Sequence, residues 1–456
     1  MERLFSIDTI EAIYMNQLLL KSGRIIDPAS DTDQTGDVLI CNGKIASISP
    51  TPISSQADTI DCEGLIIAPG LIDIHVHFRE PSNNQHEETI RTGSNAAAMG
   101  GFTTVCTMPN TAPAIDTKKL IEETIAEGNR IGCCRILPTC CATLNRAGNE
   151  LAPLDELCDS GAIAITDDGS VVENEEIMRQ ALQAAKKNNV PFMQHCQNPA
   201  LSINGAMHAG HIQEELGVGA WPRIAEESII ERDIHLNLEI GASWHAQHLS
   251  SSRSVEIIRN AQQKGFPISG EVSPHHLLLT HEDCKSLGTQ AKMNPPLREE
   301  SDINAIKVGI EDGTIAILAT DHAPHPWHTK NTTFQEASFG VIGLDCALPM
   351  YAKAIIEDGI LDWPAMLAMM TINPANLIRR LDLGRIMEGG IADITIIDPV
   401  HSWIIDSNNF GSASLNCPFD GWEATCKAIA TIQGGTVVHQ SISEHRIKDC
   451  NLNNLV

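Results

Sequence analysis

The 456-residue sequence has few aromatic residues, few cations and no long apolar run. Aromatic side chains make up only 4% of it, so the core has to rest on Ile, Leu, Val and Ala. With 31 Lys and Arg against 58 Asp and Glu, the net charge is -27, and such a surface repels nucleic acids and anionic membranes. No stretch approaches the ~20 apolar residues of a transmembrane helix. We therefore expect neither a nucleic-acid partner nor a membrane partner.

Cysteine is not scarce, but its spacing lacks the common metal and redox motifs. The 14 cysteines include no CxxC pair, which argues against a zinc ribbon or a thioredoxin-like site. The start, MERLFSIDTIEAIYMNQLLL, mixes both charge signs and lacks the basic region and clean apolar run of a secretory signal. A long chain without such a signal usually keeps its thiols reduced, so we expect a cytoplasmic protein.

Patterns typical of β-strands occur near both ends of the chain. Short apolar runs broken by turn residues fill residues 16–66, where Asn42-Gly43 predicts a hairpin turn, and similar runs recur at 389–398 and 428–438. We predict a small β-sandwich domain composed of residues 16–66 and 386–440. Residues 1–15 and 441–456 are expected to be peripheral.

Between these ends, strand-like runs alternate with helix-like runs. The predicted strands are LIDIHVH, FTTVCTM, CRILPTC, AIAITDD, PFMQHC, SWHAQHL, PISGEVS and AILATDH. This alternation fits a (β/α)8 TIM-like barrel over residues 67–385 better than an open sheet. The predicted fold class is therefore α/β, a barrel with a small β domain attached.

The first predicted strand carries two histidines in the stretch PGLIDIHVHFREP, residues 69–81. Alternate residues of a strand share a face, so Asp73, His75, His77 and Arg79 are expected to lie together. Two imidazoles and a guanidinium suit a functional site better than a core. The alternative is that they form an exposed strand face.

Polar residues close several of the other predicted strands, namely Asp167-Asp168, His195, His248 and Asp321. Each has a simpler interpretation as a turn, a hydrogen-bonded core histidine or a helix cap, and His245 competes locally with His248. In a barrel, however, these strand ends meet at the C-terminal mouth, where active sites lie. Imidazole and carboxylate together suit zinc and related ions, so the common position of these residues favours a metal centre.

The first-strand motif resembles that of the cyclic amidohydrolases, and the rest of the chain resembles the bacterial-type (class I) dihydroorotases. The similarity continues through GGFTTVCTMPNT (100–111), AITDDG (164–169), HC (195–196), EVSPHHLLLT (271–280), KMNPPLR (292–298), ILATDHAPH (317–325) and FGVIGLD (339–345). The combination is highly specific, although HxH alone is not. Ser82 after REP, HCQN in place of HCED and HLSS in place of HIST depart from the family pattern without removing a proposed ligand.

The resemblance implies two zinc ions per subunit, bridged by a carboxylate and a hydroxide. The implied metal ligands are His75, His77, Asp168, His195, His248 and Asp321. His75, His77 and Asp321 would hold one ion, His195 and His248 the other, and Asp168 would bridge the two. Many relatives bridge with a carboxylated lysine, which AIAITDDG lacks; the resemblance to the dihydroorotases implies Asp168, the aspartate just before the glycine, as the bridge. Asp167 is the alternative, since only one of two adjacent strand residues can face the site. Asp321 is also the implied catalytic acid and base.

The implied activity is the reversible conversion between (S)-dihydroorotate and N-carbamoyl-L-aspartate in de novo pyrimidine biosynthesis. Arg79 would take the substrate carboxylate in a bidentate fork. The full set implied for substrate binding is His77, Arg79, Asn110, Asn294, His325, Phe339 and Gly340. The other histidines considered, and expected to be structural, are His208, His211, His235, His245, His275 and His276.

Two other functions stay open. A hydantoinase, dihydropyrimidinase or allantoinase would act on an uncharged ring, which Arg79 and Asn110 argue against. A non-catalytic relative serving as a partner of aspartate carbamoyltransferase would be expected to have lost metal ligands, whereas all are present here. The resemblance also implies a homodimer and association with aspartate carbamoyltransferase.

Overall fold

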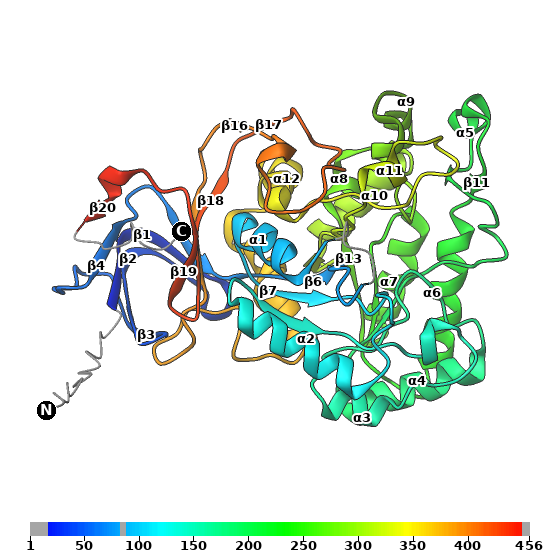
Figure 1. The fold of residues 1–456 in the computed structure, drawn as a ribbon, viewed down its shortest axis with the longest axis horizontal. Helices are drawn as coiled ribbons and strands as arrows, with labels where there is room; N and C mark the ends of the chain where they lie inside the picture. Colours follow the sequence, from blue (N-terminus) through cyan, green and yellow to red (C-terminus); the bar gives the residue numbers. More distant parts are fainter. Residues whose placement is uncertain (1–16, 83–87, 449–456) are drawn as a thin grey trace, which may run out of the picture.

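Strands from both ends of the chain form one nine-stranded sheet in the computed structural model, which describes residues 17–82 and 88–448 (Figure 1). The main path of the sheet has the order β19-β18-β15-β5-β1-β2-β3, and β4 pairs with both β1 and β20. The N-terminal strands are β1 (Gln17–Asp27), β2 (Thr32–Cys41), β3 (Lys44–Ser49), β4 (Asp58–Asp61) and β5 (Ile66–Pro69). The C-terminal strands are β15 (Ile394–Asp398), β18 (Lys427–Gln433), β19 (Thr436–Gln440) and β20 (Ile447–Lys448).

The two ends of the chain meet at β5. This strand pairs in parallel with β1 and antiparallel with β15, where Ile394 lies opposite Pro69. The predicted hairpin turn joins β2 and β3, with Asn42 and Gly43 both at positive φ, as a tight hairpin requires. At the other end, β20 pairs with β4, so the start of the tail that was expected to be peripheral joins the sheet. Residues 1–15 lie outside the described residues.

Two parallel sheets occupy the middle of the chain. One contains β6 (Leu71–Val76), β7 (Phe102–Thr107) and β8 (Arg135–Pro138); the other contains β9 (Phe192–Gln194), β12 (Trp244–Ala246), β13 (Ile268–Val272) and β14 (Ile317–Leu318). Isolated parallel bridges join Val76 with His322, Cys140 with Ile165, and Ile165 with Phe192. These bridges connect the two sheets on both sides.

The predicted strand AIAITDD, residues 162–168, forms no extended ladder and has bridges only at Ile165. Its polar side chains take up backbone donors instead. The carboxylate of Asp167 accepts from the amides of Ala142 and Thr143, at 2.8 and 3.1 Å, and the hydroxyl of Thr166 accepts from the amide of Asp168. Such local bonds compete with ladder pairing, so the segment is held in place mainly by side chains.

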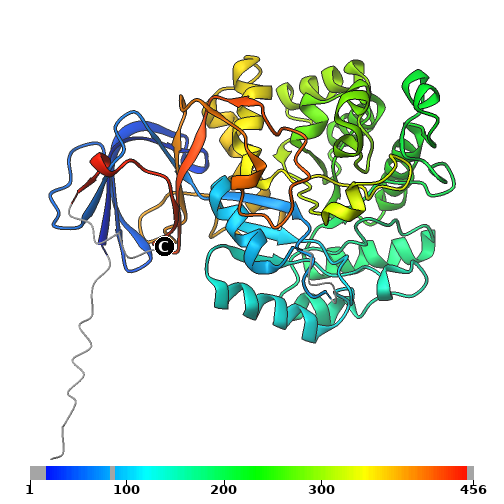
Figure 2. The same cartoon turned by 45° about the horizontal axis from the view of Figure 1, so that its top comes forward.

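Helices follow most strands of this middle region and pack around them (Figure 2). The helix-like runs TGSNAAAMGG, DTKKLIEETIAEG, NEEIMRQALQAAKK and SSRSVEIIRNAQQKG correspond to α1 (Ile90–Gly100), α2 (Lys118–Ile131), α4 (Glu175–Asn188) and α7 (Ser252–Gln263). Longer helices also include α6 (Ile224–Asn237), α10 (Glu300–Glu311) and α13 (Trp363–Met370). The short ones are α3 (Leu154–Asp159), α5 (His211–Leu216), α8 (Pro274–Leu278), α9 (Cys284–Leu287), α11 (Trp327–Lys330), α12 (Ala347–Tyr351) and α14 (Ile372–Leu377).

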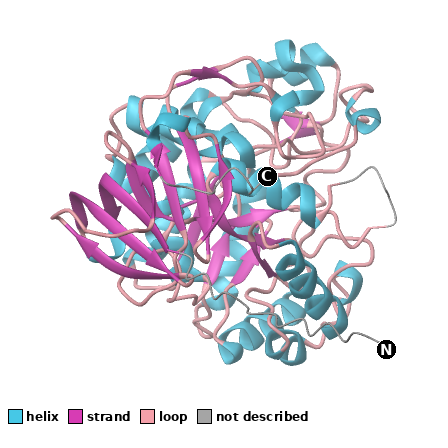
Figure 3. Cartoon of the chain, turned by 60° about the vertical axis from the view of Figure 1, so that its left-hand side comes forward, coloured by secondary structure: helices cyan, strands magenta, loops and turns pink. Residues whose placement is uncertain are grey.

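The interior is aliphatic, as the scarcity of aromatic residues predicts. The largest buried cluster lies between the parallel strands and the helices, and a second one lines the nine-stranded sheet, whose strands are seen side by side in Figure 3. Isoleucine, leucine, valine and alanine dominate both clusters. Among the residues that the structure describes, no helix is long and apolar enough to span a bilayer.

Candidate metal centre and substrate cavity

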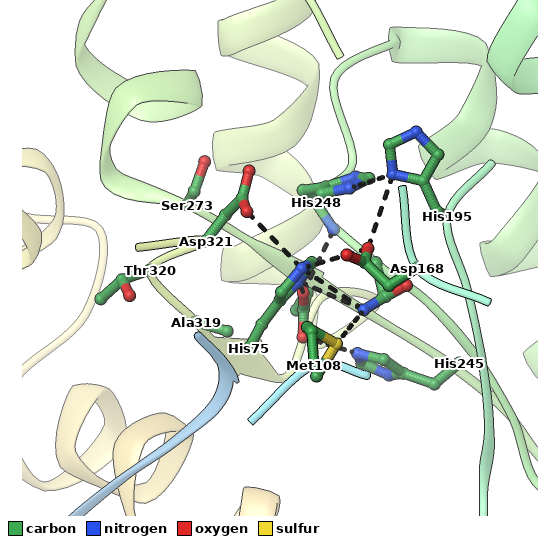
Figure 4. Close-up of polar contacts among 12 residues, drawn as sticks. His75, Met108, Asp168, His195, His245, His248, Ser273, Ala319, Thr320 and Asp321 are labelled. Carbon is green, nitrogen blue, oxygen red and sulfur yellow. Dashed lines mark hydrogen bonds and ion pairs between the residues drawn. The ribbon is translucent and has the colours of Figure 1, made fainter. Parts of the chain in front are cut away.

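The six predicted metal ligands converge at the carboxyl ends of the parallel strands, and all but His77 are labelled in Figure 4. Nε2 of His77 lies 2.9 Å from Oδ1 of Asp321, and Nδ1 of His195 lies 2.8 Å from Nε2 of His248. Between these pairs lies Asp168, with Oδ1 3.4 Å from Nε2 of His75. The six side chains share one buried spot although they come from five separate segments of the chain.

Two overlapping triads offer ligand atoms that lie within 4.8 Å of one another. They are His75 with His77 and Asp321, and His75 with Asp168 and His248. His195 belongs to neither triad, but its Nδ1 is 3.6 Å from Oδ1 of Asp168. The first triad is the ligand group implied for one ion. In the second triad, His75 lies next to His248, which was implied to bind the other ion.

Outward-facing hydrogen bonds fix how the imidazoles are protonated. Nδ1 of His75 lies 2.5 Å from a carboxylate oxygen of Glu271, and Nδ1 of His77 lies 3.0 Å from Oδ1 of Asn110. Nε2 of His195 lies 2.9 Å from Oε1 of Gln197. Carboxylate and amide oxygens only accept, so the outward nitrogen of each ring donates and the inward nitrogen is the one that a cation would bind. This arrangement orients imidazoles toward a cation.

The electrostatics of the site also favour a cation. Although burial raises the pKa of Asp168, the neighbouring His77 and His75 hold it well below its usual range, so this carboxylate is charged. Its Oδ1 is buried and has no hydrogen-bond partner among the described residues. Burial is the main cause that lowers the pKa of His248 well below its ordinary value, and the nearby His195 lowers it further, so the ring of His248 is neutral. A buried carboxylate with one unpartnered oxygen, placed among four imidazoles, fits divalent metal ions.

Asp167 and Asp168 face opposite ways. The carboxylate of Asp167 is occupied by the amides of Ala142 and Thr143 and by the hydroxyl of Thr143. Asp168 faces the histidines. Of the two alternatives for the bridge, only Asp168 is within reach of the ligand set.

Two of these residues hold an unfavourable backbone conformation. His248 has a φ of 33° and Asp321 a φ of 49°, in the left-handed region that non-glycine residues seldom adopt. Each such residue costs on the order of 1 kcal/mol or more, and such strain is concentrated at functional sites. Here the left-handed conformation follows the ends of β12 and β14 and lets the side chains of His248 and Asp321 face the other ligands.

A cavity of about 410 Å³ opens beside the ligand set. Its walls are formed by His77, Arg79, Asn110, Arg146, Asp168, Gly169, His195, His248, Asn294, Asp321, Ala323, His325, Ser338, Phe339 and Gly340. Every residue implied to bind substrate is in this set. Metal donors and a guanidinium that line the same cavity can together hold an anionic ring against a cation.

The polar residues of the cavity also hold one another in place. Nδ2 of Asn110 donates to Asp168 over 3.3 Å, and Nδ2 of Asn294 donates to Gln197 over 2.9 Å. Nε2 of His325 donates to the carbonyl of Phe339 over 2.6 Å. Burial is the main cause that lowers the pKa of His325 to about 3, and the charge of Arg79 adds to it, so this ring is neutral.

A buried lysine anchors the loop that carries Phe339 and Gly340. The ammonium of Lys330 donates to the carbonyls of Lys292, Ser338 and Gly340 at 2.9 to 3.2 Å, which uses all three of its protons. Gly340 has a φ of 125°, and a Cβ there would lie 2.6 Å from the Cβ of Ala323. The loop therefore needs both the glycine and the lysine to lie against the cavity.

Sequence reasoning missed Glu271, Gln197, Arg146 and Lys330. Glu271 lies in the predicted strand PISGEVS and in the family-like stretch EVSPHHLLLT, which was a usable signal. His245 binds Ser269 and Glu271, and His276 binds Ser273 and the carbonyl of Pro295, outside the ligand set. Lys330 had no local signal, because lysines are seldom buried.

Comparison with known proteins agrees with this geometry. The sequence model of the amidohydrolase family matches residues 66–438, so the chain belongs to the amidohydrolase family. Within that family its relatives include dihydroorotases. Those of Pelobacter propionicus and Endomicrobium trichonymphae are each 40% identical to it, over 93% of this chain and 99% and 100% of their own lengths.

Solved structures show the same fold at lower identity. An L-hydantoinase (dihydropyrimidinase) from Arthrobacter aurescens superposes with a TM-score of 0.84 at 24% identity, over 94% of this chain and 97% of that one. A D-hydantoinase (dihydropyrimidinase) from Thermus sp. gives 0.79 at 22% identity over the same shares. Family and neighbours together imply a TIM-barrel domain with an attached β domain, in agreement with the predicted α/β class.

Proposed function

We propose that this protein is a metal-dependent dihydroorotase, which interconverts (S)-dihydroorotate and N-carbamoyl-L-aspartate in pyrimidine biosynthesis. Relatives of that name match it at 40% identity along nearly their whole length. The observation that carries the proposal is one cavity lined by five of the six proposed metal ligands together with Arg79, Asn110 and His325. A cyclic imide that bears a carboxylate needs metal ions beside its ring carbonyl and a cationic or hydrogen-bonding group for its carboxylate.

The proposed cofactor is a pair of zinc ions per subunit. His75, His77 and Asp321 would hold one ion, His195 and His248 the other, and Asp168 would bridge them. The unpartnered Oδ1 of Asp168 and the outward hydrogen bonds of His75 and His195, which turn their other ring nitrogens inward, support this assignment. When bound, such ions supply a Lewis acid for the ring carbonyl and lower the pKa of water.

The residues of the chain position the ring and move one proton. The guanidinium of Arg79 takes the substrate carboxylate together with Asn110 and His325, and Asn294 and the backbone at Phe339 and Gly340 meet the polar edge of the ring. His77 lines the same cavity and completes the proposed substrate-binding set. A neutral His325 has only one N–H, so a bound carboxylate favours proton uptake by this ring.

Asp321 is the proposed general base and acid. It accepts a proton from the water that attacks the ring carbonyl and delivers this proton to the leaving ring nitrogen, so the amide bond breaks and a carboxyl group forms, which releases the second proton of the water to solvent. The same groups close the ring in the reverse direction. Cyclisation needs a protonated carboxyl group as the electrophile, so lower pH favours it.

The remaining proposals concern architecture and setting. We propose that the bridged segments complete a closed (β/α)8 barrel over residues 67–385, with residues 16–66 and 386–440 forming a β-sandwich domain. The connecting bridges and the sheet shared by both chain ends support this division. A homodimer, association with aspartate carbamoyltransferase and a cytoplasmic location stay proposals. The last is supported by the free thiols of every cysteine in the described ranges.

The test is a parallel assay of purified protein on dihydroorotate, hydantoin and allantoin, combined with metal analysis. We expect turnover of dihydroorotate alone and at least two zinc ions per chain. Turnover of only the neutral rings would instead identify another cyclic amidase. Metal-loaded protein that is inactive on all three substrates would indicate a non-catalytic relative.

A further inference from the structure

A second cluster of metal-type donors lies outside the cavity. It combines His211, the first residue of α5, with His281 and Glu282, the first two residues of a short helix, η3 (His281–Asp283). Their ligand atoms all lie within 4.8 Å of one another. The rings of His211 and His281 are nearly perpendicular, with centroids 5.7 Å apart. Two segments about 70 residues apart in sequence thus bring two imidazoles and one carboxylate together.

His281 is poised to act as a ligand. Its Nδ1 lies 3.2 Å from the carbonyl oxygen of Arg298, which can only accept, so Nδ1 carries the proton of the neutral ring and Nε2 keeps a lone pair. The side chain is only 5% exposed, and Nε2 has no hydrogen-bond partner in the part of the chain that the structure describes. A buried acceptor left without a partner costs about 1–3 kcal/mol, which a cation at Nε2 would remove.

The neighbouring His208 does not belong to the donor set. Its Nδ1 lies 3.2 Å from a guanidinium nitrogen of Arg298, which can only donate, so the proton of this ring is on Nε2. That nitrogen faces Glu299 at 3.6 Å. The available donors are therefore two imidazole nitrogens and one carboxylate oxygen. Mg²⁺ and Ca²⁺ prefer oxygen ligands, whereas this mixed set suits Zn²⁺ and its transition-metal neighbours.

We propose that His211, His281 and Glu282 form a binding site for one divalent transition-metal ion of the Zn²⁺ type, separate from the centre in the cavity. Three protein ligands leave a fourth position for water. The site is open to solvent on the side of His211 and Glu282, both exposed, so the ion can exchange. His211 and His281 thereby gain a role other than packing.

The ion would link α5, which begins at His211, to the short helix η3, which begins at His281. An ion pair of 2.5 Å between Glu215 in α5 and Lys285 in α9 already links the same region. After α5 the chain returns as β11 (Ala220–Trp221), and the ring of Trp221 packs edge-on against Phe339 at 5.7 Å. Phe339 is part of the cavity wall, so an ion at α5 stabilises a segment that supports the substrate loop.

The experiment compares the Zn²⁺ content of full-length protein variants equilibrated against the same free Zn²⁺ concentration. His211→Ala combined with Glu282→Gln removes two of the three donors, both exposed. His235→Ala, which removes an exposed histidine of α6, is the matched control. We expect the double variant to hold one ion fewer per chain than both the wild type and the control. Zn²⁺ should also raise the Tm of the double variant less than that of the wild type, with equal Tm values in chelator.

Equal Zn²⁺ content in wild type and double variant would overturn the proposal, as would an equal loss in the control. Because the measurement is metal content and Tm, its result does not depend on whether the protein hydrolyses dihydroorotate. Failure of the proposed function would leave the one-ion difference in place, and failure of this site would leave turnover in place.

Discussion

Glu271 offers a direct test of how the candidate metal centre is organised. Its carboxylate is 1% exposed and accepts from Nδ1 of His75 at 2.5 Å and from Nε2 of His245 at 2.9 Å. Replacement by leucine leaves Nδ1–H of His75 without an acceptor in a dry interior. The ring can escape this by moving its proton to Nε2, which is the nitrogen that should bind metal.

The expected loss can be estimated from the hydrogen bond. A hydrogen bond to a charged group contributes about 1.5–3 kcal/mol, which corresponds to roughly a ten- to hundred-fold weaker affinity for Zn²⁺. Loss of a group that orients a metal ligand costs a similar factor, about 10–100-fold. The assay is equilibrium competition for Zn²⁺ with a chromogenic chelator. Dihydroorotate turnover, measured in parallel, should recover as free Zn²⁺ rises.

Two further variants sharpen this test. Glu271→Gln should retain much of the affinity, because the amide oxygen can accept from His75 while its NH2 group faces His245, whose proton can move toward Ser269. Asp302→Leu removes another buried acid, paired with Arg223, and should lower Tm without weakening Zn²⁺ binding. Wild-type affinity in Glu271→Leu would refute the reasoning, and so would an equal loss in Glu271→Gln.

Four other predictions concern the cavity and the loop beside it. Asp321→Asn should keep the fold but lose at least ~100-fold in turnover, because an amide cannot carry the proton; near-normal turnover would remove Asp321 from the acid–base role. Arg79→Ala should raise the KM for dihydroorotate about ten- to hundred-fold with a smaller change in kcat, and an unchanged KM would argue against carboxylate binding there. Asp168→Ala should lower the metal content of purified protein, whereas Asp167→Ala should mainly lower Tm; the opposite pattern would move the bridge to Asp167. Burial, with the charge of Lys292, lowers the pKa of Lys330 to about 7 from an ordinary 10.5, so between these values the unfolded chain binds more protons and stability rises with pH. Lys330→Met should remove that rise, which is at most about 1.4 kcal/mol per pH unit, and Tm differences between wild type and variant that do not change from pH 6 to pH 9 would contradict it.

Local sequence patterns were enough to predict most parallel strands and the positions of the candidate ligands. The alternation in LIDIHVH corresponds to β6, and His195 and His248 follow β9 and β12 as expected. These predictions succeed because the period of a strand and the common edge of parallel strands are properties of any such fold. Within each parallel sheet, the strands that follow one another in sequence are also neighbours in space.

Other features depend on contacts that no local pattern encodes. Glu271 is 196 residues from His75, and their hydrogen bond exists only once the strands lie side by side. AIAITDD has the composition of a strand, but Asp167 takes up backbone amides that a ladder would have used. Lys330 is buried against three carbonyls, contrary to the usual exposure of lysine. Such sites follow from the assembled fold.

The place of β5 in the nine-stranded sheet has a consequence for biosynthesis. Its partner on one side, β15, begins at Ile394, more than 320 residues after Pro69. At about 5–20 residues per second, roughly 15–65 s pass between the emergence of these two strands from the ribosome. During that interval the apolar edge of β5 is open to pairing with other nascent chains. We expect fragments that stop before residue 394 to aggregate, and the newborn chain to depend on a chaperone until its last strands arrive.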